Sequence, residues 1–314
     1  MNILITGGAG FIAKNLVGEL LRHNYNIITI YRETIPKKFI GKVKMIQYKG
    51  SYNDLEENLK DEQIDIVIHL ATHFTSKHRT DEIRELFESN ILLGTYLLEY
   101  MKNHEVKKFI NTSTYATSIN GRNYNPQNLY SATKKAFEDI LIFYAESEKI
   151  QSVNLELSDT YGLGDTRPKF LNLLLEAIKE NREFNMSPGE QEICYIHVKD
   201  VVSAYLRAIE MLVNGDIRKL ENYSVYGNEV LTLNQLVDKV QDIFGTNIQV
   251  NKGVYPYRER EIMKFKPKYP VLPGWKPQVS LRQGILEIMG GGASNENWEN
   301  YYRGSIYPKR FTKF

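Results

Sequence analysis

Residues 3–16 read ILITGGAGFIAKNL, and this stretch decides how the chain folds. Apolar residues typical of a buried strand run into a glycine-rich turn, which runs into apolar residues at helical spacing. A dinucleotide pyrophosphate binds to backbone N–H groups at the start of a helix, where side chains would keep it away. Gly7 permits the tight turn, Gly10 lets the phosphates approach the backbone, and Ala13 permits close packing of helix on strand. A plain strand-to-helix turn is the alternative, but the position of the glycines after the first strand favours dinucleotide binding.

Short apolar strands alternate with amphipathic helices through the first half of the chain. This alternation indicates βαβ units, and strands that are apolar throughout indicate a parallel sheet covered on both faces. The predicted fold is α/β, a doubly wound parallel sheet (Rossmann) with a smaller C-terminal substrate domain. We expect residues 1–160 to form the dinucleotide-binding domain and residues 291–314 a flexible tail. Residues 161–290 are expected to form mainly the substrate-binding region, with strands and helices that return to the first domain.

Composition argues against several classes of function. The chain has 314 residues and a formal net charge of +2, which gives no electrostatic basis for binding nucleic acid or a membrane surface. No apolar run reaches the length of a membrane-spanning helix. The single cysteine, Cys194, cannot form an internal disulfide, and its apolar setting is typical of a buried structural thiol. We therefore expect a cytoplasmic protein with no nucleic-acid or membrane partner.

The end of the second strand indicates which dinucleotide is bound. NAD-specific sites usually place an acidic residue there, where it binds the ribose 2′-hydroxyl. This chain reads ITIYRET over residues 28–34, so Arg32 stands in that region, with Lys37 and Lys38 nearby. An arginine can pair with the 2′-phosphate of NADP(H). NADP(H) is therefore favoured over NAD(H), and a solvated basic loop is the alternative.

A second signal is the stretch LYSATKKAFED at residues 129–139. Tyr130 and Lys134 are four residues apart at the start of a predicted helix and share a face. A nearby ammonium is expected to lower the pKa of the phenol, which can then exchange a proton with a hydroxyl or carbonyl group. Thr112, Ser113 and Thr114 end the preceding strand and offer a hydroxyl to the same substrate oxygen. A solvated Tyr–Lys pair on a helix is the alternative.

Together these motifs resemble a known family, the extended short-chain dehydrogenase/reductases that act on nucleotide sugars (the NAD-dependent epimerase/dehydratase family). The resemblance covers nearly all of the chain up to residue 277. It rests on the Thr114, Tyr130 and Lys134 set and on the stretches TGGAGFI (6–12), DIVIHLA (65–71), SNILLGTYLLEY (89–100), TYGLGD (160–165), YIHVKDV (195–201) and GWKP (274–277).

The resemblance implies roles for individual residues and a nucleotide-sugar substrate held by the second half of the chain. It gives Thr114, Tyr130 and Lys134 as catalytic, with Lys134 also binding the nicotinamide ribose. It implies a homodimer through the helices at 83–101 and 130–144, and His69, His73 and His197 are not expected to bind a metal. The implied cofactor contacts are Gly7, Gly10, Phe11, Ile12, Arg32, Leu70, Ala71, Thr72, Asn90, Tyr130 and Lys134. The implied substrate contacts are Thr72, Thr114, Tyr115, Asp159 and Arg258.

The family that the chain resembles includes three reaction types on nucleotide sugars: 4,6-dehydration, 4-epimerisation and reduction of a C4 ketone. Nucleotide-sugar 4,6-dehydratases carry an Asp–Glu pair after the catalytic threonine, whereas Tyr115 and Ala116 follow Thr114 here. The stretches FINTSTYA and YREREIM look most like the reductases of 4-keto-deoxyhexose nucleotides, the CDP-abequose synthase group. We therefore expect NADPH-dependent reduction of a C4 ketone. An NAD-dependent 4-epimerase is the main alternative, and an NADP(H)-sensing binding protein is the second.

Three positions depart from the family pattern, and one of them is Ser51, which stands where the family has an adenine-side aspartate, with Asp54 three residues on. Ile193 stands where an arginine commonly binds the substrate diphosphate, and Glu156 stands where the family has an arginine. Arg258, Arg260 and Arg167 are candidate replacements for the diphosphate ligand, and of these Arg258 matches a family position.

Overall fold

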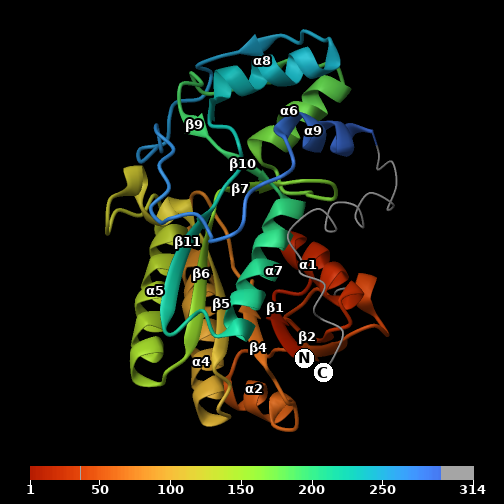
Figure 1. Cartoon of the computed structure of the whole chain (residues 1–314). Coiled ribbons are helices and arrows are strands. Elements are labelled where there is room, and N and C mark those ends of the chain that lie inside the picture. The colour runs from red at the N-terminus through yellow and green to blue at the C-terminus, as the bar shows by residue number, and fades with distance from the viewer. Residues whose placement is uncertain (36, 291–314) are drawn as a thin grey trace.

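A computed structural model describes residues 1–35 and 37–290 of the chain (Figure 1). Seven strands form one sheet in the order β3-β2-β1-β4-β5-β6-β11, and every neighbouring pair is parallel. The predicted doubly wound parallel sheet is confirmed. The strands are β1 (Asn2–Thr6), β2 (Asn26–Tyr31), β3 (Lys44–Gln47), β4 (Ile66–His69), β5 (Lys108–Thr114), β6 (Gln151–Leu157) and β11 (Leu220–Val225).

Helices cover both faces of this sheet, which explains why its strands are apolar throughout. On one face, α1 and α7 bury a core with the sheet, and on the other face α2, α4 and α5 bury a second core. The order of the strands reverses between β1 and β4, and ligands in such sheets bind beyond the carboxyl ends of the strands at this point. The helices are α1 (Phe11–Arg22), α2 (Tyr52–Leu59), α4 (Leu93–Asn103), α5 (Leu129–Ser147) and α7 (Val198–Asn214).

A smaller part lies above the carboxyl edge of the sheet in Figure 1 and has its own apolar core. It contains α6 (Phe170–Lys179), α8 (Leu233–Phe244) and α9 (Leu281–Met289). Residues 161–290 also supply α7 and β11 to the large sheet and its covering layer. The expected tail, 291–314, lies outside the described residues. Short strand pairs complete this part: β7 (Asp159–Tyr161) with β10 (Tyr195–His197), β8 (Phe184–Asn185) with β13 (Val250–Asn251), and β9 (Glu192–Ile193) with β12 (Leu231–Thr232).

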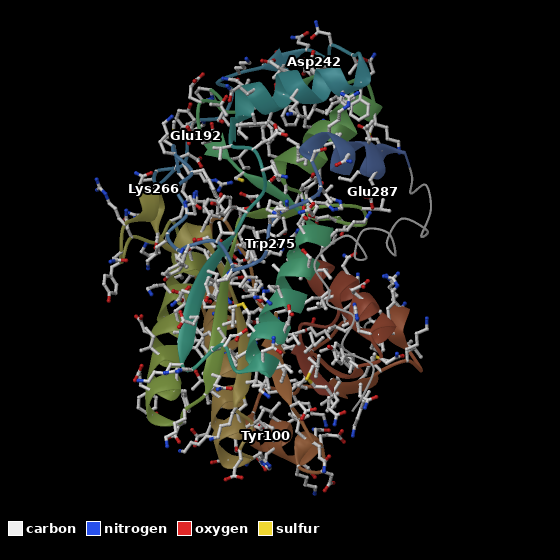
Figure 2. All side chains as sticks on the ribbon, viewed as in Figure 1. Tyr100, Glu192, Asp242, Lys266, Trp275 and Glu287 are labelled. Carbon is white, nitrogen blue, oxygen red and sulfur yellow. The ribbon has the colours of Figure 1, made fainter. Side chains whose placement is uncertain are left out.

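Trp275 joins the two parts, and Figure 2 shows it at the centre of the molecule. Its indole is buried, and Nε1 donates to Ser203 Oγ on α7 at 2.8 Å. The Asp200 carboxylate, also on α7, accepts from the backbone N–H groups of Gln278 at 2.7 Å and Val279 at 3.1 Å. The GWKP segment is therefore anchored to α7 immediately before it leads into α9.

The expected helix over residues 83–101 contains an interruption. It consists of α3 (Ile83–Phe87), the π-helical turn η3 (Glu88–Leu92) and then α4. A π turn inserts one extra residue per turn and re-aims the side chains within it. Here it buries Asn90 against the loop that follows β4. Short 3₁₀ turns are η1 (Lys37–Phe39), η2 (Thr80–Glu82), η4 (Tyr115–Thr117) and η5 (Ile119–Gly121). Across the described ranges, no helix has both the length and the apolar character needed to span a bilayer.

Candidate active site

The glycine turn joins β1 to α1 at the reversal point of the sheet. Gly7 has φ +72°, and a Cβ at this position would lie 2.9 Å from the backbone of Ala71 at the end of β4. Both constraints require glycine. Gly10 is the N-cap of α1 and supplies no side chain to satisfy the first N–H groups of the helix. Those N–H groups are therefore free of a side-chain cap, and an anion at this helix terminus can accept from them.

A cleft of about 560 Å³ opens beside this turn. Its walls come from the turn, the ends of β2, β4, β5 and β6, the start of α5, and the segment from β7 to α6. Most of the predicted site residues meet here, although they come from distant segments. The cleft is lined by Gly7, Gly10, Phe11, Ile12, Arg32, Leu70, Ala71, Thr72, Thr114, Tyr115, Tyr130 and Asp159, whereas Asn90, Lys134 and Arg258 are not among its lining residues.

Tyr130 lies in the first turn of α5, which begins at a capping box in which Asn128 Oδ1 accepts from Ser131 N at 2.9 Å. The Phe74 ring packs edge-on against Tyr130, with 4.9 Å between ring centroids. Burial raises the pKa of Tyr130 to about 12, while a hydrogen bond with Thr72 and the charge of Arg167 act in the opposite direction. The phenol therefore keeps its proton at neutral pH.

Lys134 lies one turn further along α5, and its side chain is buried. Burial lowers the pKa of Lys134 to about 8, while the Glu138 carboxylate one turn later raises it. The sequence predicts that Lys134 lowers the pKa of Tyr130, whereas the net direction of the Tyr130 pKa in the structure is upward. Burial has the largest effect on the phenol, and the nearby cation that favours the phenolate is Arg167.

Thr114 is the hydroxyl of β5 that remains available to a substrate. Thr112 Oγ1 shares a 2.6 Å hydrogen bond with Tyr205 OH on α7, and Ser113 Oγ donates to the Glu138 carboxylate on α5. Thr114 Oγ1 makes a 3.3 Å local contact with Ala116 N at the end of the strand. The geometry therefore favours Thr114 as the hydroxyl that contacts the substrate, because the other two hydroxyls are bonded to helices on opposite faces of the sheet.

Asn90 lies beneath the cleft and bonds to protein groups there, whereas the resemblance implies a contact with the cofactor. Its side chain is fully buried, and its Oδ1 accepts from Thr72 Oγ1 and His73 N, both at 2.8 Å. Its Nδ2 donates to His73 O at 3.0 Å and to Thr133 Oγ1 at 2.9 Å. Because these bonds occupy both polar atoms of the amide, Asn90 ties the loop after β4 to α5 and holds Thr72 at the cleft.

Arg32 lines the cleft where the sequence places it. Its Nη2 lies 3.0 Å from Glu85 Oε1, and the same oxygen lies 3.1 Å from His73 Nδ1. The Arg32 and Glu85 side chains are about 44% and 43% exposed. Exposed ion pairs of this kind contribute little free energy. A phosphate can therefore compete with Glu85 for the guanidinium.

The segment between β7 and α6 contributes two cations to the cleft, Arg167 and Lys169. Arg167 is one of the three arginines considered from the sequence, whereas Lys169 and the ring of Phe74 were not considered. Arg258, the predicted substrate contact, is exposed, and Arg260 is bound to Pro126 O at 3.0 Å. Arg258 is not among the residues that line the cleft, and its contact with the substrate stays a prediction. The missed signal is the spacing of two basic residues directly after the TYGLGD stretch.

Comparisons with known proteins find relatives in sequence and solved structures of the same fold. A CDP-abequose synthase from Yersinia pseudotuberculosis is 28% identical over 273 residues, which cover 86% of this chain and 93% of the relative. A UDP-glucose 4-epimerase from Thermotoga maritima with UDP-glucose superposes with a TM-score of 0.79 at 22% identity, over 98% of this chain and 100% of that one. The Thermus thermophilus UDP-glucose 4-epimerase in complex with NAD gives 0.75 at 23% identity, over 98% of this chain and 100% of that one.

The family assignment follows from a match to a family model. The model is described as the NAD dependent epimerase/dehydratase family, and it matches residues 3–225. The matched range runs from β1 to β11 and contains the glycine turn and the threonine, tyrosine and lysine described above. The resemblance seen in the sequence motifs is therefore confirmed, and the chain belongs to the NAD dependent epimerase/dehydratase family.

Proposed function

We propose that the protein uses NADPH to reduce the C4 ketone of a nucleotide-linked 4-keto-deoxysugar, in nucleotide-sugar biosynthesis for a surface polysaccharide. The observation that carries this proposal is that Thr114 and Tyr130 line the same cleft as the glycine turn and Arg32. The similarity to CDP-abequose synthase over most of both chains supports a 4-ketoreductase.

The residues at the turn fit a nicotinamide dinucleotide. The α1 N-terminus offers uncapped N–H groups to a pyrophosphate, and Gly10 keeps side-chain atoms out of the way. A nicotinamide dinucleotide held there would supply a hydride to C4. Thr114 donates a hydrogen bond to the ketone oxygen, and Tyr130 donates the proton that this oxygen gains, so that ketone, hydride and proton give the alcohol.

The protonated state of Tyr130 supports reduction of a ketone over oxidation of a hydroxyl. With a pKa raised to about 12, the phenol is a proton donor near neutral pH. A 4-epimerase begins instead by taking a proton from the C4 hydroxyl, which requires the phenolate. The 4-epimerase is the second candidate, because both solved structures described above are epimerases of the same fold.

The assay that separates the two candidates follows NADPH absorbance with 4-keto-6-deoxyhexose nucleotides made in place by a dehydratase. The CDP, GDP, dTDP and UDP forms are tested in turn. A reductase consumes NADPH in proportion to product. Absence of turnover on all four forms by correctly folded protein would contradict the proposed reaction. Interconversion of C4 epimers, assayed separately with the 4-hydroxy nucleotide sugars and without net change in cofactor, would favour the 4-epimerase instead.

The choice of cofactor rests on Arg32. We expect NADPH to bind at least about tenfold more tightly than NADH, roughly 1.4 kcal/mol for a charge-assisted contact with the 2′-phosphate. Arg32→Ala should abolish the preference, and Glu85→Gln should strengthen it because the guanidinium loses its competing carboxylate. Arg84→Ala is the matched control, since that arginine pairs with Glu88 on an exposed helix. Equal affinities for the two cofactors in wild-type protein would refute the assignment.

A further inference from the structure

Two cations lie on the wall of the cleft contributed by the segment between β7 and α6. Arg167 and Lys169 both line the cleft, near the catalytic Tyr130. Within the described residues that line this cleft, the basic side chains are Arg32, Arg167 and Lys169. Arg32 follows β2 and lies at the end of the cleft where we propose that the 2′-phosphate of NADP(H) binds. The charge at the reacting end therefore comes from Arg167 and Lys169.

Arg167 is held in one orientation. Its Nε and Nη2 donate to the two oxygens of Asp165, both at 2.6 Å, and Nη2 also donates to Thr160 Oγ1 at 3.0 Å. The Asp165 side chain is completely buried behind the guanidinium, whose carbon lies 5.0 Å from the centroid of the Phe11 ring. Within the described part of the chain, Nη1 has no hydrogen-bond partner. A fixed guanidinium with a free N–H edge is pre-organised to bind an anion, because little conformational entropy remains to be lost.

Lys169 is held more loosely beside it. Its Nζ lies 3.5 Å from Asp159 Oδ1 and 3.5 Å from Thr160 O, both at the outer limit of a hydrogen bond. The other Asp159 oxygen accepts from Tyr115 OH at 2.7 Å. Burial lowers the pKa of Lys169, so the ammonium lacks full compensation from its surroundings. A phosphate oxygen near Nζ would supply that compensation.

The positions that the family pattern suggests for this task do not supply a cation to the cleft. Ile193 lies in β9, where it pairs with Leu231 of β12, and Arg258 lies on the exposed surface outside the cleft lining. Nucleotide sugars carry a diphosphate, which needs cationic partners when it leaves water. A cleft that binds such a substrate must therefore obtain its cations elsewhere.

We propose that Arg167 and Lys169 bind the diphosphate of the nucleotide-sugar substrate and replace the arginine missing at Ile193. The inference rests on the proposed substrate class. The dinucleotide also carries a pyrophosphate, but the uncapped N-terminus of α1 serves that group. Arg167 fixes the diphosphate through its free N–H edge, and Lys169 adds a second charge next to Asp159.

The test is calorimetric titration of the protein saturated with NADP⁺ by UDP, CDP, GDP and dTDP. With the cofactor in place, its own pyrophosphate no longer competes. Lys169→Met and Arg167→Lys should each weaken the tightest of the four diphosphates at least about tenfold. The affinity for NADP⁺, measured separately, should stay within about twofold. Lys179→Met on the exposed side of α6 is the matched control and should change neither affinity.

The diphosphate and NADP⁺ affinities of the variants separate the possible outcomes. Unchanged diphosphate affinity in folded Lys169→Met would overturn the proposal, as would a large loss in Arg258→Ala with none in the other two variants. A loss of NADP⁺ affinity without a loss of diphosphate affinity would assign the two cations to the cofactor and also overturn it. If NADP⁺-loaded wild-type protein binds none of the four diphosphates at millimolar concentration, the proposed substrate class itself fails.

Discussion

Replacing Glu156 by glutamine should stabilise the protein, and the gain should depend on pH. Glu156 lies near the carboxyl end of β6, between β5 and the edge strand β11, and is 2% exposed. One of its oxygens accepts from Ser224 Oγ at 2.7 Å and from Lys268 N at 3.3 Å. The other, Oε2, has no hydrogen-bond partner among the described residues. Glu138, also buried, adds a second negative charge nearby.

Burial raises the pKa of Glu156 from 4.5 to about 7. The folded protein therefore holds this proton more tightly than the unfolded chain does. Below about pH 4.5 the side chain is protonated in both states and carries no penalty. As the pH rises towards 7, the unfolded chain loses its proton first, so folding stability falls by about 1.4 kcal/mol per pH unit. Above about pH 7 the penalty is constant at roughly 3 kcal/mol.

Glutamine has the shape of the protonated acid and carries no charge, so Glu156→Gln should remove this penalty. Urea unfolding at about pH 5 and about pH 8 measures it. At the higher pH the midpoint should rise by about 1 M, for an m-value near 3 kcal/mol/M, and at the lower pH the gain should be much smaller.

Glu192→Gln is the control of opposite sign. Lys264 and the backbone N–H of Phe265 hold the pKa of Glu192 below its ordinary value, so its stabilisation is present above that ordinary value and is lost as the pH falls. Glu192→Gln should therefore lower stability near neutral pH. A stability change in Glu156→Gln that is the same at both pH values would refute the reasoning.

The remaining predictions concern activity and assembly. Tyr130→Phe should lower turnover by roughly 10²–10⁴-fold and leave NADPH affinity within a few-fold. Tyr144→Phe is the control: it loses a 2.7 Å hydrogen bond to Glu99 and should not change turnover. A Tyr130→Phe enzyme as fast as wild type would contradict the mechanism. The rate of ketone reduction should fall above about pH 8 as Lys134 loses its proton. Lys134→Arg keeps its charge, so it should remove that decline while lowering the maximum rate. If the pH–rate profile of Lys134→Arg is the same as that of wild type, Lys134 does not supply a catalytic charge. The expected homodimer should be visible by light scattering at micromolar concentration, and Phe143→Asp on the outer face of α5, where this side chain is 60% exposed, should give a monomer; a wild-type monomer refutes the dimer.

Local sequence predicted the features that depend on local chemistry. The glycine turn was recognisable because Gly7 needs a positive φ and a close approach to Ala71. The parallel sheet was recognisable because strands buried on both faces must be apolar along their whole length. In the same way, Tyr130 and Lys134 share a face through helical spacing, which the sequence specifies directly.

The features that sequence did not reveal depend on neighbours from distant segments. The π turn at Asn90 arises from its bonds to the loop after β4 and to α5, and helical periodicity alone gives no sign of it. The direction of the Tyr130 pKa shift depends on how deeply the folded chain buries the phenol. Likewise, Lys169 reads as an ordinary surface lysine until the fold places it beside the cleft.

The path of the chain between the sheet and the smaller part limits how substrate preference can be engineered. A chimera cut once at residue 160 would take α7 and β11 from the donor, so a foreign strand and helix would have to pack against the native sheet. A graft of two pieces, about residues 161–197 and 226–290, would keep α7 and β11 native. Such a graft still replaces the Trp275 segment, which bonds to Ser203 and Asp200 on α7. These hydrogen bonds are lost unless the donor segment can form them with the retained helix. Recombination between relatives should therefore succeed only where the donor's counterpart of the GWKP segment fits the recipient's α7.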